Sequence, residues 1–157
     1  MTAVRIRPAA VTDVPVLASI AAAAYLPYML RIGRAPAPLT ADYAAAVRRG
    51  QVWLATSGDQ GASTAEALGL IVLVPQPGYL LLENVAVTPS AQGRGVGTAL
   101  LDFAAAQARE LGLPEIRLYT NAAMTENLAY YPRQGYQETG RREEDGFNRV
   151  YFTRHLV

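Results

Sequence analysis

The sequence predicts an α/β fold, an α+β arrangement in which one mixed β-sheet carries helices on both faces. Strand-like and helix-like segments follow in the order β-α-α-β-β-β-α-β-α-β-β, which gives about seven strands and about four helices. Most strands are joined by short connections, whereas one joining segment is a long amphipathic helix, typical of a crossover. A length of 157 residues suits one compact domain, so we expect a single domain over residues 1–157.

The N-terminal part is expected to form a strand, two helices and three further strands. An alternating segment ends at Pro8, and an Ala-rich segment follows Thr12, a typical N-cap residue. A second, shorter helix is preceded by Thr40 and ended by Gly50, and residues 57–64 are expected to form a polar loop. The expected strands are Val4–Arg7, Gln51–Thr56, Ala65–Val74 and Tyr79–Val87, and the expected helices are Val14–Tyr28 and Thr40–Arg49.

The C-terminal part is expected to form a long helix, a strand, a short helix and two strands. Val96, Leu100 and Phe103 have the spacing of one helix face. Pro132 disfavours the helical region for Tyr131, so the short helix is expected to end there. The charged segment 140–146 is expected to join the last two strands. The expected helices are Arg94–Leu111 and Met124–Tyr131, and the expected strands are Glu115–Asn121, Gly135–Thr139 and Phe147–Thr153.

A glycine-rich turn joins the fourth strand to the long helix and reads Gln-Gly-Arg-Gly-Val-Gly from Gln92 to Gly97. Backbone N–H groups at a helix N-terminus are unpaired, and the helix dipole there favours negative charge. Glycines let the backbone approach a ligand closely. The turn therefore predicts a site for a phosphate or pyrophosphate group.

Two common nucleotide-binding motifs do not fit this turn. A P-loop requires a lysine after its last glycine, and this chain contains no lysine. The dinucleotide motif Gly-x-Gly-x-x-Gly, started at Gly93, requires a glycine where Thr98 stands. The turn instead fits the pattern Gln/Arg-x-x-Gly-x-Gly/Ala.

This pattern, preceded by Val-Ala-Val-Thr-Pro, resembles the acyl-CoA signature of the GNAT superfamily of N-acetyltransferases. A second similarity lies downstream, where Asn127–Tyr131 is followed by Gly135 and Tyr136. The matched motifs and the strands joining them span about residues 65–152. The resemblance implies a GNAT-like fold, in which two central strands separate at a bulge and the pantetheine arm of the cofactor enters the gap. Here those strands would be Leu80–Val87 and Arg117–Asn121.

The resemblance also implies acetyl-CoA as co-substrate. Backbone N–H groups from Val85 to Val87 would bind the acetyl carbonyl and pantetheine amides and would stabilise the oxyanion. The turn would hold the pyrophosphate, although an ordinary glycine-rich turn is the alternative interpretation. Two asparagines are further candidates. The expected cofactor-binding residues are Val85, Ala86, Val87, Gln92, Gly93, Arg94, Gly95, Val96, Gly97, Thr98, Asn121 and Asn127.

Two residues are candidates for the chemistry. An alkyl amine resembles lysine, with a pKa of about 10.4, so only about one molecule in 10³ is neutral at pH 7 and a general base helps. Glu83 interrupts an apolar strand, where partial shielding from water would make it a stronger base. Tyr131 matches the family tyrosine by its spacing from Gly135 and would protonate the departing thiolate. The alternative for Glu83 is an ion pair at the strand end, and the alternative for Tyr131 is a tyrosine of the core. Tyr130 is a lesser candidate for the acid.

The acceptor is expected to be a small amine bound by the first helices and the last hairpin. Tyr28, Arg31 and Asn84 are the candidate contacts. Arg31 and Arg34 would bind a carboxylate if they are not simply solvated surface residues. Strand alternation places Glu83 and Val85 on one face of the strand and Asn84 on the other. If Asn84 faced the ligand instead of Glu83, the assignment of the base would fail.

Composition excludes several other classes of function. The net charge of +1 gives no support for nucleic-acid binding, and one histidine with no cysteine makes a zinc site improbable and a cysteine acyl-enzyme impossible. We also expect no apolar run of membrane-spanning length, no membrane partner, a cytoplasmic location and, from the Ala- and Arg-rich composition, a bacterial source.

The sequence thus predicts a direct acetyl transfer from acetyl-CoA to a small amine. A GNAT-fold module that binds acyl-CoA without catalysis and a protein or peptide N-acetyltransferase are the alternatives. A homodimer is compatible with the fold that the resemblance implies.

Overall fold

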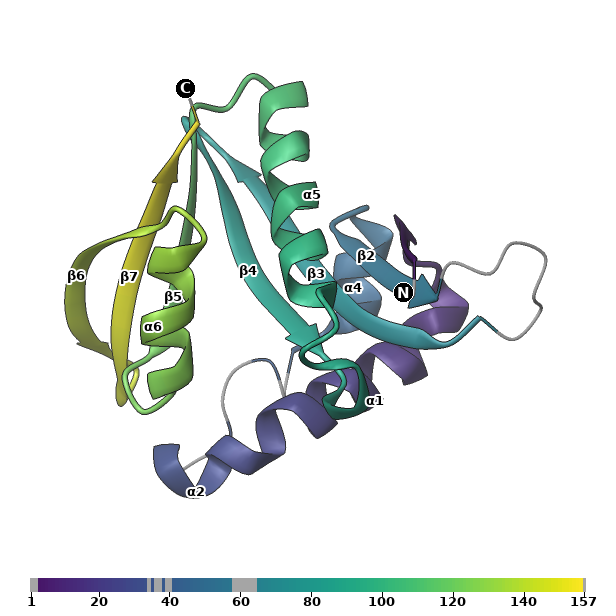
Figure 1. Ribbon diagram of the computed structural model, residues 1–157, viewed down its shortest axis with the longest axis horizontal. Helices are drawn as coiled ribbons and strands as arrows, with labels where there is room; N and C mark the ends of the chain where they lie inside the picture. Colours follow the sequence, from purple (N-terminus) through teal and green to yellow (C-terminus); the bar gives the residue numbers. More distant parts are fainter. Residues whose placement is uncertain (1–2, 34, 36–37, 39–40, 58–64, 157) are drawn as a thin grey trace.

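The computed structural model describes residues 3–33, 35, 38, 41–57 and 65–156, and shows a seven-stranded sheet with helices on both faces (Figure 1). The strand order is β1-β2-β3-β4-β5-β7-β6, in which β4 and β5 run parallel and the other neighbours antiparallel. This mixed sheet confirms the predicted fold class. The strands are β1 (Val4–Pro8), β2 (Val52–Ser57), β3 (Ala67–Gln76), β4 (Tyr79–Val87), β5 (Glu115–Asn121), β6 (Gln137–Glu144) and β7 (Phe147–His155).

The helices follow the expected order, with some different ends. A 3₁₀ turn at Val11–Asp13 leads into α1 (Val14–Tyr25), and a second at Leu26–Tyr28 continues into α2 (Met29–Ile32). A third 3₁₀ turn, Pro89–Ala91, precedes the glycine-rich turn. Among the described residues, further helices are α4 (Tyr43–Arg48), α5 (Val96–Glu110) and α6 (Thr125–Arg133).

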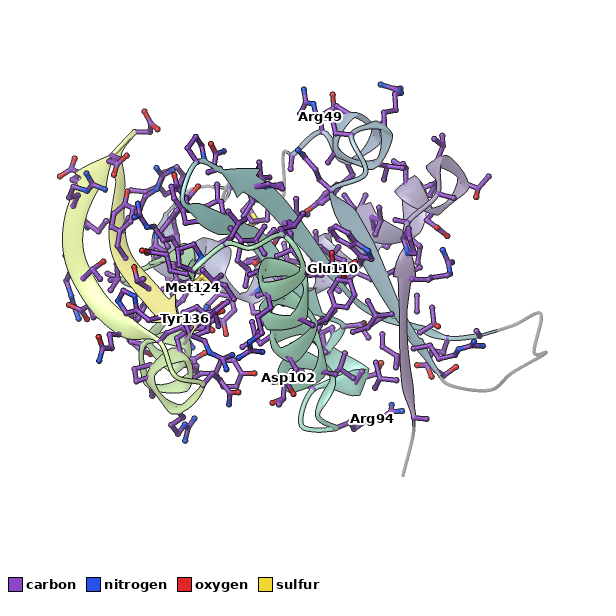
Figure 2. All side chains as sticks on the ribbon, turned by 90° about the horizontal axis from the view of Figure 1, so that it is seen from above. Arg49, Arg94, Asp102, Glu110, Met124 and Tyr136 are labelled. Carbon is purple, nitrogen blue, oxygen red and sulfur yellow. The ribbon has the colours of Figure 1, made fainter. Side chains whose placement is uncertain are left out.

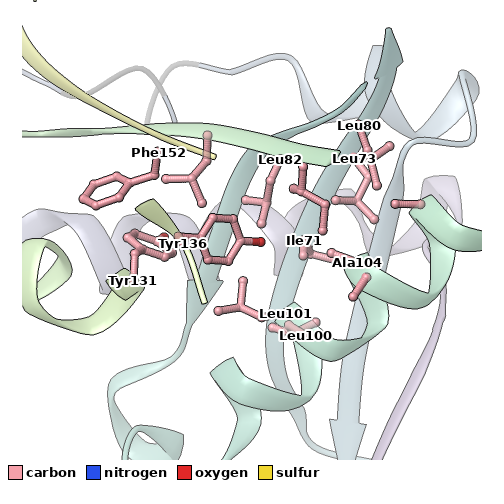
Figure 3. Close-up of a cluster of buried hydrophobic side chains, with 14 of the residues drawn as sticks. Ile71, Leu73, Leu80, Leu82, Leu100, Leu101, Ala104, Tyr131, Tyr136 and Phe152 are labelled. Atoms are coloured by element: carbon pink, nitrogen blue, oxygen red, sulfur yellow. The ribbon is translucent and has the colours of Figure 1, made fainter. Parts of the chain in front are cut away.

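Two apolar cores cover the two faces of the sheet. The α5-side core packs α5 and α6 on the sheet and contains Leu82, Leu101, Tyr131 and Tyr136 (Figure 3). The α1-side core packs α1 and α4 on the opposite face and contains Leu17. Because the two cores are separated by the sheet, any opening between its strands connects the two sides of the molecule.

Such an opening lies between β4 and β5. These strands pair only at Leu80–Ile116 and Leu81–Arg117, after which they separate, as Figure 1 shows. This is the separation that the GNAT-like resemblance implied, and it leaves one edge of β4 without a neighbouring strand.

A bulge at Glu83 accompanies the separation. The adjacent β3 residues Val72 and Leu73 pair with Asn84 and Leu82, respectively, so Glu83 is an extra residue without a partner on β3. The bulge reverses the alternation of β4: even-numbered residues before it lie in the α5-side core, and Ala86 after it lies in the α1-side core. The sequence alone did not locate this bulge.

Several expected boundaries were wrong. Pro132 lies inside α6, which ends at Arg133 rather than at Tyr131. Strand β6 extends to Glu144, so the turn of the last hairpin is only Asp145 and Gly146, both with positive φ. The N-caps of α1 and α4 are aspartates, Asp13 and Asp42, and not the threonines that were expected; Thr40 and most of the polar loop, residues 58–64, lie outside the described residues.

The helical segment Val11–Ile32 corrects a further expectation. It has 22 residues with a mean hydropathy of 1.4, and by length and composition it is sufficient to cross a membrane. The expectation that no apolar run reaches this length was therefore wrong. A helix that packs on a sheet passes the same test, and here Leu17, Ile20 and Ala21 of this segment are buried in the α1-side core. The segment by itself is thus weak evidence for a membrane span.

Replacing Gly69 by alanine is expected to lower the free energy of unfolding by about 1–3 kcal/mol. A Cβ atom at Gly69 would lie 2.7 Å from the Ala86 carbonyl oxygen and 3.2 Å from Leu100 Cδ1, so β4 or α5 would have to shift. Urea unfolding measures the effect. Gly140→Ala is the matched control, because a Cβ there meets nothing within 4 Å. Equal stability of the two variants would contradict this account of the β3–α5 contact.

Candidate active site

A cleft of about 400 Å³ opens where β4 and β5 separate. It is bounded by β4, β5 and β7 of the sheet and by α1, α4 and α6. Its lining combines aromatic, polar and charged side chains, which is typical of a site for a small polar ligand. Among the lining residues are Tyr25, Tyr43, Glu83, Asn84, Tyr119, Asn121, Asn127, Tyr131 and Arg149.

The free edge of β4 presents backbone groups to this opening. The Thr88 N–H donates a hydrogen bond to the Leu68 carbonyl, which shows that the backbone N–H of Thr88 is directed to β3. Because inward and outward residues alternate in an antiparallel pair, the Ala86 N–H is directed to β3 and the N–H groups of Val85 and Val87 are directed to the gap. Two of the three predicted donors therefore face the gap.

Side chains donate hydrogen bonds to the backbone carbonyl groups along the same edge. The Tyr25 hydroxyl donates to the Val85 carbonyl at 3.0 Å, and Gln92 Nε2 donates to the Val87 carbonyl at 3.1 Å. The edge is thus left with outward N–H donors, as binding of a carbonyl oxygen requires. Gln92 ties the glycine-rich turn to β4 through this bond.

The glycine-rich turn leads directly into the N-terminus of α5. Gly93 and Gly95 have φ values of 80° and 81°, a region that other residues rarely adopt, so the turn requires glycine at both positions. Gly95 is the N-cap of α5, and the first helical bond runs from the Ala99 N–H to the Gly95 carbonyl. The N–H groups of residues 96–98 consequently have no partner in the preceding turn of the helix. Figure 2 shows Arg94 on this turn, on the opposite side of the sheet from Arg49 of the α4 region.

Helix α6 closes against this turn through Tyr130. A Cβ atom at Gly97 would lie 3.2 Å from the Tyr130 hydroxyl oxygen. A larger residue at position 97 would therefore displace the Tyr130 hydroxyl by a few tenths of an ångström. The contact places Tyr130 of α6 beside the N-terminus of α5.

Glu83 lies at the bulge of β4 and lines the cleft. Its side chain is exposed, so the protein itself does not supply the shielding from water that the strand pattern had suggested. The exposed position gives the carboxylate access to both water and a ligand in the cleft. Its role as a base stays a prediction.

Asn84 is buried and lies at the centre of a hydrogen-bonded chain. The Tyr25 hydroxyl shares its one proton between the Val85 carbonyl and Asn84 Oδ1, which lies closer at 2.7 Å, and Asn84 Nδ2 donates to the Tyr43 hydroxyl at 2.9 Å. The Tyr43 hydroxyl donates in turn to the Pro38 carbonyl at 2.7 Å. Burial raises the pKa of Tyr43 to about 12, so this hydroxyl stays protonated. Both polar ends of Asn84 thus contact the protein, and its predicted contact with the acceptor stays untested.

Replacing Tyr25 by phenylalanine is expected to lower the free energy of unfolding by about 1–3 kcal/mol, because it leaves the buried Asn84 Oδ1 atom without its donor. Thermal or urea unfolding measures the loss. Tyr79→Phe is the matched control and is expected to change stability by less than about 0.5 kcal/mol, since among the described residues the Tyr79 hydroxyl makes no hydrogen bond. A Tyr25→Phe protein as stable as the control would show that the chain does not brace β4.

Tyr131 lies in the α5-side core and also lines the cleft. Its ring packs against those of Tyr130, Tyr136 and Phe152, with ring centroids 5.6–5.7 Å apart. Burial raises the pKa of Tyr131 well above its usual value of 10, with smaller contributions from Tyr136 and Tyr130. The hydroxyl therefore stays protonated and able to donate throughout the physiological pH range.

Asn121 and Asn127 lie at the far end of the gap and line the cleft. Asn121 Oδ1 accepts from the Ala123 N–H at 2.8 Å and shapes the turn between β5 and α6. Asn127 Nδ2 donates to Thr120 Oγ1 at 3.1 Å. Both side chains thus brace the β5–α6 connection, and their predicted cofactor contacts stay untested.

Tyr28 and Arg31 contact α6 and do not line the cleft. The Tyr28 hydroxyl donates to Glu126 Oε2 at 2.8 Å, and Arg31 Nη1 lies 2.7 Å from Glu126 Oε1. These hydrogen bonds lower the pKa of Glu126 to about 2, and the bond from Arg31 has the larger effect. The two candidates thus link the end of the first helical segment to α6, and their role in acceptor binding stays a prediction.

Several side chains of the cleft were not predicted from the sequence, among them those of Tyr43, Tyr119 and Arg149. Tyr43, Tyr119 and Arg149 come from α4, β5 and β7, and only the sheet order brings them together. The one local signal was that Arg149 alternates with apolar residues of a strand that is buried on its other face.

The fold and the cleft define a class of acyl-group transferases with a separated β4–β5 pair. Residues 48–138 match the family model described as an acetyltransferase (GNAT) domain, which covers more than half of the chain. The chain therefore belongs to the GNAT acetyltransferase family.

Two curated relatives match parts of the chain. The mycothiol acetyltransferase of Jonesia denitrificans is 34% identical over 77 residues, which cover 48% of this chain and 24% of the relative. The IAA acetyltransferase of Azospirillum brasilense is 29% identical over 79 residues, which cover 50% of this chain and 52% of the relative. The matched segments thus span about a quarter and about half of these two proteins.

Solved structures share the fold at low sequence identity. The PaiA N-acetyltransferase from Thermoplasma acidophilum, solved with coenzyme A, has a TM-score of 0.76 at 15% identity and covers 98% of this chain and 99% of its own. The ribosomal-protein-S18-alanine N-acetyltransferase from Escherichia coli has a TM-score of 0.74 at 19% identity, covering 98% and 94%. At these identities the likeness concerns the fold.

Proposed function

We propose that the protein is an N-acetyltransferase that moves an acetyl group from acetyl-CoA directly to a primary amine of a small molecule. The observation that carries this proposal is the convergence of Glu83, Tyr131 and the free N–H edge of β4 on one opening in the sheet. The chain contains no cysteine, so direct transfer is favoured over a cysteine acyl-enzyme.

The residues around the opening fit an acyl-CoA molecule. The N–H groups at the start of α5 suit the pyrophosphate, and the outward N–H groups of Val85 and Val87 suit carbonyl oxygens. Gly97 keeps the approach to the helix free of a Cβ atom. When bound, acetyl-CoA supplies an activated thioester.

Glu83 is assigned the role of general base. The neutral fraction of the acceptor attacks the thioester carbonyl, and the exposed carboxylate accepts, directly or through water, the proton that the nitrogen loses as the new bond forms. The N–H groups of Val85 and Val87 donate to the oxygen on which negative charge develops. Asn84, held by two tyrosines, positions the bulge that carries Glu83.

Tyr131 is assigned to the leaving thiolate. Its pKa lies well above 10, whereas a thiol has a pKa of about 8.5, so complete proton transfer from the phenol is uphill. Tyr131 therefore stabilises the thiolate by donating a hydrogen bond, and water supplies the final proton.

The proposal is tested by release of free CoA thiol from acetyl-CoA with polyamines, amino acids, aminoglycosides and peptides. The protein has no cysteine and adds no thiol signal. Amine-dependent release supports the proposal and names the acceptor class. Binding of acetyl-CoA without release favours the non-catalytic module, and the absence of binding would overturn the cofactor assignment.

Release with peptide N-termini alone would favour a protein or peptide N-acetyltransferase. A homodimer and a cytoplasmic location stay predictions, which size-exclusion chromatography with light scattering and cell fractionation would test.

A further inference from the structure

We infer that the amine acceptor also carries a carboxylate. Arg149 binds this carboxylate, while Glu83 acts as the base for the amine. This inference rests on the proposed function and adds the chemical class of the acceptor. It starts from the distribution of charge in the cleft, whose charged lining residues are Asp42, Glu83, Arg49 and Arg149.

Arg149 is the shielded cation of this set. Its side chain is 13% exposed, whereas Arg49 is an exposed residue next to the end of α4. Asp42 Oδ1 is occupied in capping α4, where it accepts from the Ala45 N–H at 3.0 Å. Glu83 and Arg149 therefore remain as the carboxylate and the guanidinium available to recognise a ligand from opposite sides.

Aromatic rings hold the Arg149 guanidinium in place. Its central carbon lies 4.4 Å from the ring centroid of Tyr119 and 5.7 Å from that of Phe147, and both rings line the cleft. A guanidinium fixed in this way loses little further freedom on binding, and its planar N–H groups match the two oxygens of a carboxylate.

The protein's own carboxylates satisfy Arg149 only in part. Nη1 lies 3.6 Å from Glu144 and 3.9 Å from Asp145, both longer than the 2.7–2.9 Å that is usual for a charge-assisted hydrogen bond. Glu144 is also 3.3 Å from Arg142 and accepts from the Tyr151 hydroxyl. The shared, distant carboxylates leave Arg149 with capacity for a closer anionic partner.

The two charges stand across the opening. Glu83 is on β4 and Arg149 on β7, with β5 between them, so their backbones are separated by at least about 10 Å, two interstrand spacings. Side chains reaching inward from both strands can contact the two ends of a short zwitterion. By contrast Arg31, a candidate carboxylate contact from the sequence, is paired with Glu126, and Arg34 lies outside the described residues.

The test compares amino acids with their amides, from glycine and glycinamide to the β-alanine and γ-aminobutyrate pairs, by CoA release. Wild-type protein is expected to favour the acid of at least one pair, and Arg149→Gln is expected to reduce that acid-to-amide ratio of kcat/KM about 10- to 100-fold. Arg149→Lys keeps the charge but not the paired N–H geometry, and is expected to restore the ratio only in part.

Arg117→Gln is the matched control. Arg117 also stacks on a tyrosine, 4.1 Å from the Tyr79 centroid, and pairs with Glu115 at 2.8 Å, but it lies outside the cleft. Its acid-to-amide ratio should equal that of wild type. An unchanged ratio in Arg149→Gln, or a wild-type preference for every amide, would overturn the inference and leave the proposed function in place. Failure of the proposed function would differ, because no amine of any class would then release CoA.

Discussion

Replacing Glu83 by glutamine is expected to lower kcat about 10²–10⁴-fold, the usual contribution of a general base. Glutamine keeps the size of the side chain at the β4 bulge but cannot take a proton from the acceptor. The residual rate should rise about tenfold per pH unit below the pKa of the amine, because only its neutral form reacts. Steady-state kinetics from pH 7 to 10 measures both effects.

The same variant should bind acetyl-CoA with unchanged affinity, which isothermal titration calorimetry measures. Glu83 has an exposed side chain and makes no hydrogen bond among the described residues, so its replacement leaves the backbone donors of β4 in place. Glu143→Gln, an exposed glutamate of β6 outside the cleft, is the control and should keep full activity. Normal turnover by Glu83→Gln would show that another group, or water alone, acts as the base.

Replacing Tyr131 by phenylalanine is expected to lower kcat about 10- to 100-fold, the loss expected when one hydrogen bond to a charged group is removed. The buried aromatic packing with Phe152 is kept, so stability should change little. Because burial holds the pKa of Tyr131 above 10, the wild-type rate should show no loss from ionisation of this tyrosine up to pH 10.

Two neighbouring tyrosines make this prediction specific. Tyr136 is 2% exposed, and its hydroxyl has no hydrogen-bond partner among the described residues, so Tyr136→Phe should keep activity and stability (Figure 3). Tyr130→Phe separates the two candidates for the acid, because the Tyr130 hydroxyl lies beside Gly97 at the start of α5. A larger loss of kcat in Tyr130→Phe than in Tyr131→Phe would transfer the assignment to Tyr130.

The sequence was sufficient for the order of the elements and for the fold class. Strands β4 and β5 have the predicted ends, because each is a mainly apolar or alternating segment bounded by turn-forming residues. The end of α6 was wrong because tertiary packing of Tyr131 in the core outweighs the local preference that Pro132 imposes. The helical caps were wrong because serine, threonine and aspartate near a helix start are equivalent in pattern, and only geometry selects among them.

The candidate site divides in the same way. The glycine-rich turn before α5 was predictable, since its function depends on consecutive residues and on backbone geometry that glycine permits. The bulge at Glu83 was not, because it depends on how two strands pair across the sheet and not on the sequence of either strand.

By itself the sequence determined the mixed sheet, the glycine-rich turn before the long helix and the pair of motifs that resemble one family. Only the tertiary structure decided which side chains share the cleft: it brought Arg149 of β7 and Tyr43 of α4 to the same opening as Glu83, and it paired Arg31 with Glu126 outside that opening. The physical reason is that strand order and the separation of β4 from β5 are set by packing between distant segments, whereas turns and periodicity are set by neighbours in the chain.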